Sequence, residues 1–262
     1  MYRFYCVNAD FSKTSFVITD THEIHHIKDV LRLKKGSLIQ IFNGKSQQAD
    51  ATIELINESM IEVLIGKVKQ GKDGASKIIL ACSPPKKGKF EFIIEKCTEL
   101  GVDEIIPLRT KRTEVIFSED KMAGKISRFE SVAVNASKQS KRLKVPHISA
   151  MTGLSQVLKN LGPQDLKIMP TLNSQPLYIL DVLEKNMSFP SASVGNLVSG
   201  PPTKTFGGDS VVIFIGPEGD FTPDEVELAI KHGCVPVSLG DTVLKVETAA
   251  IATVALVRFL QR

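Results

Sequence analysis

The chain has 262 residues, of which 42% are hydrophobic and 24% charged, and its formal net charge is +4. This composition is typical of a globular protein with a sizeable core and excludes a disordered or low-complexity chain. The first residues form no apolar targeting segment, and the longest apolar stretch, 249–257, is far shorter than the roughly 20 residues of a membrane span. We therefore expect a cytoplasmic protein.

Charge is unevenly distributed along the chain. Residues 1–76 carry about +1, residues 77–150 about +6 and residues 151–262 about −3. A local basic excess suits a polyanionic partner, and a solvated basic face without a partner is the alternative interpretation. The cysteines Cys6, Cys82, Cys97 and Cys234 lie far apart without a CxxC pair. This spacing favours reduced thiols in the core over disulfides or structural zinc.

The first 70 residues predict mainly strands. Residues 38–42 and 51–56 flank Asn43-Gly44, a strong hairpin signal, and a third strand is expected at 60–65. A helix is expected from about Thr21 to Leu33, ending at Gly36. Together these elements predict a small antiparallel barrel. The polar, glycine-rich residues 70–76 predict a linker to a second domain.

Beyond the linker, short apolar strands alternate with amphipathic helices, which indicates an α/β domain with a parallel sheet. One helix carries Phe90, Ile93, Ile94, Cys97 and Leu100 at helical spacing and ends at Gly101. A longer helix shows a stripe from Met122 to Ala136. The irregular residues 186–209 predict either a lid or a surface loop. The expected strands are 78–82, 104–108, 167–172, 211–215 and 235–239.

The residues His22-Glu23-Ile24-His25-His26 match the zinc-peptidase pattern H-E-x-x-H. We reject a metal site here, because the predicted helix ends within about ten residues and no third ligand stands out. The helix also carries Lys28, Arg32, Lys34 and Lys35. It is therefore interpreted either as an RNA-facing basic helix or as a surface helix without a special role.

Two loops that follow apolar strands are candidate ligand sites. The first, 215–221, contains Gly216 and Gly219 and leads into a helix that begins with Thr222, Pro223 and Glu225, a capping box. The second, 239–249, leads into the apolar C-terminal helix. Ligands of open α/β sheets bind beyond the carboxyl ends of the strands, so both loops can face one cavity. Leu239 or Leu244 would form an apolar wall for a flat heterocycle.

Basic side chains gather in two further segments. Phosphate contacts would explain both groups, although cations near a helix C-terminus also complement its dipole. The two groups are Lys86, Lys87, Lys89, Arg109, Lys111 and Arg112, and then Lys138, Lys141, Arg142 and Lys144.

Five short motifs follow one another along the chain. They are His25-His26 with Val30-Leu31-Arg32, Glu95 to Val102, Gln139-Ser140-Lys141-Arg142, Ile215 to Gly219, and Leu239-Gly240 with Glu247-Thr248-Ala249. Taken together and in order, they resemble those of the RsmE family of ribosomal small-subunit methyltransferases, and the resemblance runs over essentially the whole chain.

This resemblance implies a PUA-like RNA-binding β-barrel over residues 1–72 and a SPOUT α/β methyltransferase domain over 73–262. The SPOUT sheet would be parallel, covered by helices on both faces and tied in a trefoil knot. The resemblance also implies a homodimer that uses S-adenosylmethionine to methylate N3 of one uridine in 16S rRNA of the small ribosomal subunit. No metal is implied. The C-terminal helix, 248–260, is a candidate for the dimer patch or for the core.

The resemblance also implies the site residues. The methyl donor would bind Thr171, Leu172, Ile215, Gly216, Gly219, Leu239, Gly240, Leu244, Val246 and Thr248. RNA would contact His25, Arg32, Lys86, Lys87, Arg112, Lys138, Lys141 and Arg142. Arg112 and Arg142 are catalytic candidates because arginines can stabilise charge on the uracil oxygens. Glu218 is a candidate as proton acceptor or as a structural cap on its loop.

The chain departs from the family pattern at Asp220, where a second glycine is usual, at Lys245-Val246 in place of Arg-Thr, and at Phe129 in place of Trp. We expect Asp220 to alter the loop conformation or to weaken phosphate binding, and Lys245 to lose the bidentate fork of arginine. Two alternative functions remain open: a noncatalytic RNA-binding or ribosome-assembly protein, and a SPOUT methyltransferase with another RNA target.

Overall fold

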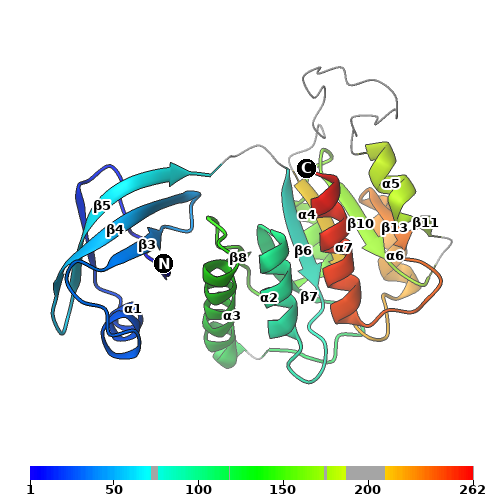
Figure 1. Cartoon of the computed structure of the whole chain (residues 1–262). Coiled ribbons are helices and arrows are strands. Elements are labelled where there is room, and N and C mark those ends of the chain that lie inside the picture. The colour runs from blue at the N-terminus through cyan, green and yellow to red at the C-terminus, as the bar shows by residue number, and fades with distance from the viewer. Residues whose placement is uncertain (72–75, 118, 174–175, 187–209, 262) are drawn as a thin grey trace, which may run out of the picture. The chain divides into compact units, whose positions relative to one another are not determined.

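A computed structural model describes residues 1–71, 76–117, 119–173, 176–186 and 210–261. The chain forms two units, shown with their element labels in Figure 1. The first contains Met1–Gly74 together with Val134–Val145, and the second contains Ala75–Ala133 and Pro146–Arg262. The expected loop or lid at 186–209 lies almost entirely outside the described residues, as does most of the expected linker.

The first unit is built on a five-stranded sheet in the order β1-β3-β4-β5-β2. The predicted hairpin is present, with Leu38 opposite Thr52 and Phe42 opposite Gln48. The sheet is not wholly antiparallel as expected, because β1 pairs with β3 in parallel. A parallel pair needs a crossover, and here β2 and the helical segment supply it. The strands are β1 (Tyr2–Tyr5), β2 (Ser15–Ile18), β3 (Leu38–Phe42), β4 (Gln47–Ile56) and β5 (Ile61–Gln70).

The helix predicted over 21–33 is shorter than expected and changes type. It consists of α1 (Thr21–His25), capped by the Asp20 carboxylate on the N–H of Glu23 at 2.9 Å, and a π-helical turn η1 (His26–Val30). Ile24 and Ile27 are buried in the core of this unit. The helix cannot continue to Gly36, because Arg32 takes a φ of +51°.

The last turn of α3 (Glu119–Gln139) and the residues after it belong to the first unit. Arg3 donates hydrogen bonds to the carbonyl oxygens of Ser137, at 2.7 Å, and Arg142, and its guanidinium lies 3.9 Å from the ring centroid of Phe42. The Ser137 carbonyl lies in the last turn of α3 and also accepts the N–H of Arg142 at 3.1 Å, so Arg3 adds a charged donor at this helix end. Sequence periodicity predicted this helix but not its assignment to the N-terminal unit.

The second unit is an α/β domain around a parallel sheet in the order β11-β13-β10-β12-β6-β7-β8, with β9 also on β7. All of its described strand pairs are parallel, which confirms the predicted class. The strands are β6 (Lys77–Cys82), β7 (Glu104–Arg109), β8 (His147–Ile148), β9 (Thr152–Gly153), β10 (Leu166–Pro170), β11 (Leu177–Tyr178), β12 (Ser210–Ile215) and β13 (Cys234–Ser238).

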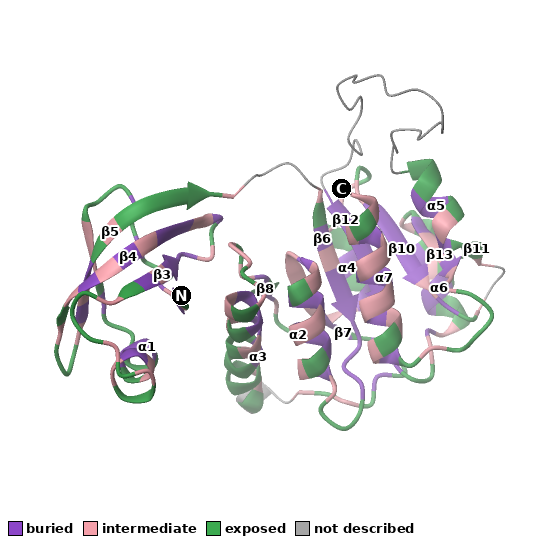
Figure 2. Ribbon diagram, viewed as in Figure 1, coloured by how far each residue is buried: buried purple, intermediate pink, exposed green. Residues whose placement is uncertain are grey.

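Helices cover both faces of this sheet. Val212 and Phe214 pack with α4 and α6, whereas the alternate positions of β12 face the side on which α7 packs against β6 and β12. Every residue of β12 is buried, as a strand covered on both faces should be (Figure 2). The helices are α2 (Phe90–Leu100), α4 (Leu154–Asn160), α5 (Ile179–Asn186), α6 (Pro223–Lys231) and α7 (Val246–Leu260).

Helix ends in this unit follow the predicted signals. Gly101 closes α2 in the left-handed conformation, with φ +105°, and Thr222 and Glu225 form the expected capping box on α6. The four cysteines are free and buried, as expected. Burial raises the pKa of the Cys6 and Cys234 thiols to about 12. No helix within the described ranges is long and apolar enough to cross a membrane.

Candidate functional site

A pocket of about 460 Å³ opens at the carboxyl ends of the central parallel strands. Its walls come from the loops after β6, β10, β12 and β13, all within the second unit. The lining residues are Lys86, Lys87, Lys89, Pro170, Thr171, Leu172, Ile215, Gly216, Pro217, Glu218, Asp220, Val237, Ser238, Leu239, Gly240, Thr242, Val243, Leu244, Lys245, Val246, Glu247 and Ala249. The volume falls within the range of pockets that hold small organic ligands.

Part of the pocket lining is apolar and is supplied by Leu172, Ile215, Leu239, Leu244 and Val246. Lysines and carboxylates also line the pocket. An apolar wall with a few polar groups suits a ligand that has a flat ring system and charged ends.

Close packing explains the glycine that follows β12. A Cβ at Gly216 would lie 3.1 Å from the ring of Phe221, which is fully buried. A side chain at this position would push Phe221 or the loop from its place. Gly216 therefore lets the loop turn tightly at the pocket wall.

Asp220 joins the loops after β10 and β12. Its Oδ2 accepts hydrogen bonds from Thr171 Oγ1 at 2.9 Å, from the N–H of Leu172 at 2.8 Å and from Asn173 Nδ2 at 3.0 Å. Its Oδ1 accepts the N–H of Phe221 at 2.7 Å. Its φ is +58°, a conformation that favours glycine. The Asp220 side chain thus makes a polar connection between two walls of the pocket.

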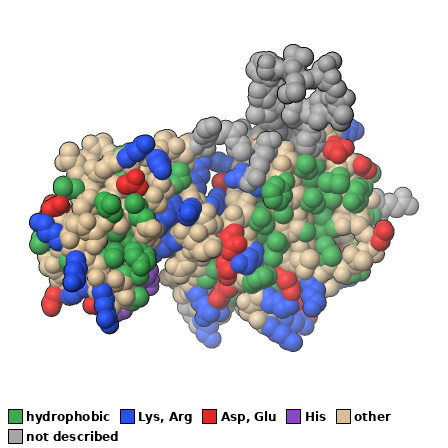
Figure 3. All heavy atoms as spheres, viewed as in Figure 1, with side chains coloured by type: hydrophobic (Ala, Val, Ile, Leu, Met, Phe, Trp, Pro, Cys, Tyr) green, Lys and Arg blue, Asp and Glu red, His purple; other side chains and the backbone are tan. Residues whose placement is uncertain are grey.

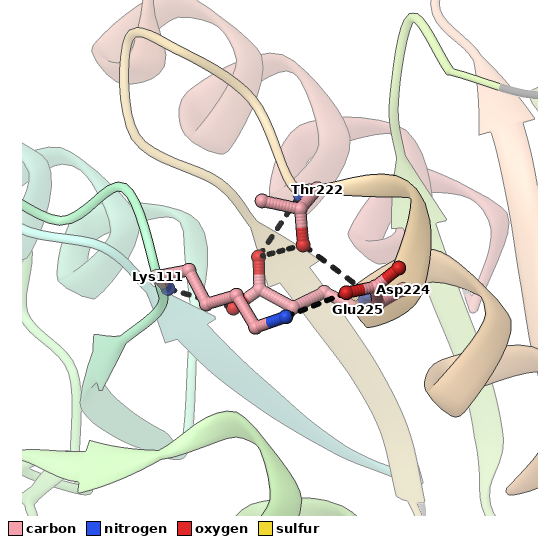
Figure 4. Close-up of polar contacts among 4 residues, drawn as sticks. All are labelled: Lys111, Thr222, Asp224 and Glu225. Carbon is pink, nitrogen blue, oxygen red and sulfur yellow. Dashed lines mark hydrogen bonds and ion pairs between the residues drawn. The ribbon is translucent and has the colours of Figure 1, made fainter.

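Glu225 connects α6 to the loop after β7 (Figure 4). One carboxylate oxygen accepts the N–H of Thr222 at 2.9 Å, and the other accepts the N–H of Lys111 at 2.7 Å. Lys111 Nζ reaches the exposed Asp224 at 2.7 Å, and this pair raises the pKa of Lys111 and lowers that of Asp224. Glu225 itself is only 6% exposed, so both of its bonds are shielded from water.

Three buried hydroxyl groups connect the loops after β6 and β7. Thr113 Oγ1 lies 2.7 Å from Ser83 Oγ and 2.9 Å from Thr110 Oγ1, and it also accepts the N–H of Thr110 at 2.8 Å. These bonds and those of Glu225 fix the loop that carries Arg112 at both ends. Its Nη1 donates to the carbonyl oxygen of Gly219. The Arg112 side chain is thereby held against the loop after β12.

Two further contacts tie the loop after β6 and the start of α2 to the pocket wall. Glu218 Oε1 accepts the N–H of Lys86 at 3.0 Å, and Lys86 Nζ pairs with Glu114 at 2.8 Å. Lys89 pairs with Glu247 in the first turn of α7, which lowers the pKa of the Glu247 carboxyl. The expected alternative for Glu218 is a structural cap on its own loop, whereas the bond described here joins Glu218 to the loop after β6.

The predicted donor-binding residues mostly line this pocket. Thr171, Leu172, Ile215, Gly216, Leu239, Gly240, Leu244 and Val246 all do so. Gly219 and Thr248 are not among the lining residues. Gly219 instead contacts Arg112, and Thr248 lies exposed in the first turn of α7.

The predicted RNA-binding residues fall in both units. Lys86 and Lys87 line the pocket, and Arg112 lies exposed in the loop after β7. His25, Arg32 and Lys141 are exposed in the first unit, where His25 pairs with Asp29 at 2.7 Å. Arg142 is partly buried there. Lys138 is paired with Glu23, and the two side chains are only 12% and 5% exposed. The Lys138 ammonium therefore neutralises a buried carboxylate of the first unit.

Several residues of the site were not predicted. Asn173, Ser83 and Thr113 make their contacts over long sequence separations, and no local pattern marks them. Pro217 and Val237 add to the pocket wall. Within the described ranges, no group of three or more His, Cys, Asp or Glu side chains is arranged to hold a metal ion.

Comparison with known proteins agrees with this architecture. Residues 72–258 match the RNA methyltransferase domain family, and residues 18–65 match the RNA methyltransferase PUA domain family. The Ribosomal RNA small subunit methyltransferase E of Bacillus subtilis is 27% identical over 94% of this chain and 90% of its own length.

Solved structures resemble the chain over nearly its whole length. A methyltransferase from Legionella pneumophila, crystallised with the cofactor SAM, superposes with a TM-score of 0.78 and 28% identity, covering 98% of this chain and 96% of its own. A Ribosomal RNA small subunit methyltransferase E from Neisseria gonorrhoeae superposes with a TM-score of 0.81 at 23% identity over 99% and 98% of the two chains, which supports the fold.

Proposed function

The chain belongs to the RNA methyltransferase family, and from this premise we propose that it transfers a methyl group from S-adenosylmethionine to N3 of one uridine in 16S rRNA of the small ribosomal subunit. The resemblance to the RsmE family seen in the motifs is confirmed by the family matches and by the curated relatives. The observation that carries the proposal is the pocket at the strand ends, which lies within the matched methyltransferase domain.

The residues of this pocket fit the methyl donor. Leu239 and Leu244 offer an apolar wall for its adenine, and the glycine turn at Gly216 leaves backbone close to the cavity. The related Legionella methyltransferase was crystallised with SAM. When bound, the donor supplies an electrophilic methyl group on its sulfonium.

In this reaction the protein aligns the target base with the methyl group and stabilises the charge that develops on the base. N3 of uracil lies on the Watson–Crick edge, so the target base has to be unpaired or flipped. We assign Arg112 to the charge that develops on the uracil oxygens, because its loop is fixed by Glu225 and by the hydroxyls around Thr113. Arg142 remains a second candidate. The bond between Glu218 and the N–H of Lys86 favours a role for Glu218 in holding the loop.

We propose that RNA phosphates contact basic residues of both units. Lys86 and Lys87 lie beside the pocket, and His25, Arg32 and Lys141 are exposed in the first unit. The match of residues 18–65 to a PUA domain supports an RNA-binding domain over 1–72 and a methyltransferase domain over 73–262. Such an enzyme would work in the cytoplasm, on rRNA or on the assembling subunit.

We also propose a homodimer and a knotted sheet. Hydrophobic side chains gather on the face of the second unit that carries α7 (Figure 3), where Phe259 is 59% exposed and Phe92 of α2 is 47% exposed. Burial of this patch against a second copy would be favourable. The knot is proposed from the resemblance to the family, and the strand order, with β12 and β13 on either side of β10, is compatible with it.

Calorimetry with S-adenosylmethionine tests the proposal against a noncatalytic RNA-binding protein. Stoichiometric binding that is weakened by Leu239→Asp, at the apolar wall, is the expected result. Absence of donor binding by the intact, folded protein would reject the enzymatic function and favour the ribosome-assembly alternative.

A further inference from the structure

Asp220 occupies a backbone conformation that its side chain does not favour. Its φ of +58° lies in the left-handed region, which residues with a Cβ adopt rarely, although Asp and Asn tolerate it better than others. A glycine would meet the backbone requirement without strain. The side chain at this position is therefore expected to supply an interaction that glycine cannot.

That interaction links two walls of the donor pocket. Oδ2 of Asp220 accepts three hydrogen bonds from the consecutive residues Thr171, Leu172 and Asn173, at 2.8 to 3.0 Å. Asn173 Nδ2 also donates to the carbonyl oxygen of Phe221 at 2.8 Å. Both Thr171 and Leu172 line the pocket, as does Asp220. The loop after β10 is thus fixed to the loop after β12 through one carboxylate.

Other contacts of this part of the loop after β10, within the described ranges, are local or lie at its start. Thr171 is buried, its N–H bonds to the carbonyl oxygen of Val237 at 3.2 Å, and its Oγ1 accepts the N–H of Asn173 at 3.1 Å, whereas Leu172 is 66% exposed. Leu172 is one of the apolar residues at the pocket, but its exposure means that packing alone holds it weakly. Hydrogen bonds to a charged acceptor are stronger than those between neutral groups.

We propose that Asp220 is a positioning residue that preforms the methyl-donor pocket by holding the loop after β10 in place before the donor enters. The inference rests on the proposed function, because it assigns the pocket to S-adenosylmethionine. In a protein that must first order this loop, the apparent Kd for the donor equals the intrinsic Kd divided by the fraction of time that the loop is in place.

Three variants test this role. Asp220→Gly keeps the left-handed backbone and removes all the side-chain acceptors, and Asp220→Asn keeps one carbonyl oxygen without the charge. Glu227→Gln is the matched control, because it removes an exposed carboxylate from α6 that pairs with Lys231 and does not line the pocket. Calorimetry measures the Kd for S-adenosylmethionine, and hydrogen exchange measures protection of the Leu172 amide in the protein without donor.

If the released loop is in place about one tenth of the time, Asp220→Gly raises the Kd about tenfold, and Asp220→Asn raises it by a smaller factor. The KM for the donor rises in parallel, while kcat at saturating donor and the KM for RNA stay within about twofold. The Leu172 amide exchanges faster in both variants. The control matches the wild type in each measurement.

A double-mutant cycle with Asn173→Ala adds a second test. Asn173 Nδ2 bonds to Asp220 and also to the Phe221 carbonyl, and only the second bond remains in Asp220→Gly. Loss of Asn173 is therefore expected to weaken donor binding more in the wild type than in Asp220→Gly. Independent, additive effects would contradict the connection.

The outcomes separate this inference from the proposed function. Wild-type protein that binds no donor would overturn both. Donor binding that is unchanged by both Asp220 variants would overturn the inference alone, even if Leu172 exchanged faster. Weaker binding without faster exchange of Leu172 would also overturn it, because the loop would then not have been released. Should Asp220→Gly fail to fold, Asp220→Asn carries the same test.

Discussion

The carboxylate of Glu225 accepts a hydrogen bond from the N–H of Lys111 at 2.7 Å, although 114 residues separate them in the chain. The same side chain completes the capping box of α6. One buried group therefore both begins a helix and fixes the loop that carries Arg112. We therefore expect changes at Glu225 to affect both the stability and the activity of the second unit.

Glu225→Ala is expected to destabilise the second unit by about 2 kcal/mol, because it removes a helix cap and leaves the Lys111 N–H unpaired. It should also lower kcat, since the loop of Arg112 loses one of its attachments. Urea unfolding and single-turnover methylation measure the two effects. The exposed Glu227→Gln serves as control, with a change within about 0.5 kcal/mol. A stable, fully active Glu225→Ala would refute the link.

RNA binding should depend on exposed cations of the first unit. Arg32→Ala and Lys141→Ala are each expected to lower the slope of log K against log salt by about one counterion. Fluorescence anisotropy with an rRNA fragment at several salt concentrations measures the slope. Lys231→Ala on α6 is the control, because it removes an exposed lysine outside the proposed RNA surface. Unchanged slopes would remove Arg32 and Lys141 from that surface.

Lys138, in contrast to Arg32 and Lys141, is expected to contribute to the stability of the first unit. Lys138→Met leaves Glu23 buried without its cation and is expected to destabilise the first unit by about 3 kcal/mol. Adding Glu23→Gln should recover part of that loss, because no unpaired charge then remains buried. Thermal unfolding followed by circular dichroism distinguishes the variants. If the two substitutions destabilised the protein additively, the pair would not be coupled as the structure indicates.

The ion pair between Lys89 and Glu247 predicts that the free energy of unfolding depends on pH. The bond from Lys89 holds the pKa of the Glu247 carboxyl below its ordinary value of 4.5. A depressed carboxyl pKa stabilises the folded state at neutral pH, and this contribution is lost as the pH falls through the folded-state pKa. The stability difference between wild type and Lys89→Met should therefore be present at pH 7 and shrink below pH 4.5. A difference that is constant across this range would contradict the assignment.

Local signals in the sequence predicted much of the fold. Asn43-Gly44 marked the hairpin, Gly101 marked the end of α2, and Thr222 with Glu225 marked the start of α6. Each of these is a short-range effect of backbone conformation or of capping, so it can be read from neighbouring residues.

Contacts between distant residues could not be predicted in this way. The parallel pairing of β1 with β3, the assignment of the end of α3 to the first unit and the bonds of Asp220 to Thr171 and Leu172 all depend on tertiary structure. The strand pattern predicted which loops would share an edge of the sheet. The departure from the family pattern marked Asp220 as an unusual residue, but its partners required the structure.

Nucleoside mass spectrometry tests the central claim most directly. The protein is incubated with S-adenosylmethionine and small ribosomal subunits that lack the modification, and the rRNA is then digested to nucleosides. The proposed function predicts 3-methyluridine, which should be lost with Arg112→Ala and retained with Glu227→Gln. Donor binding without any 3-methyluridine in naked rRNA or in assembled subunits would contradict the proposed target and point to another RNA.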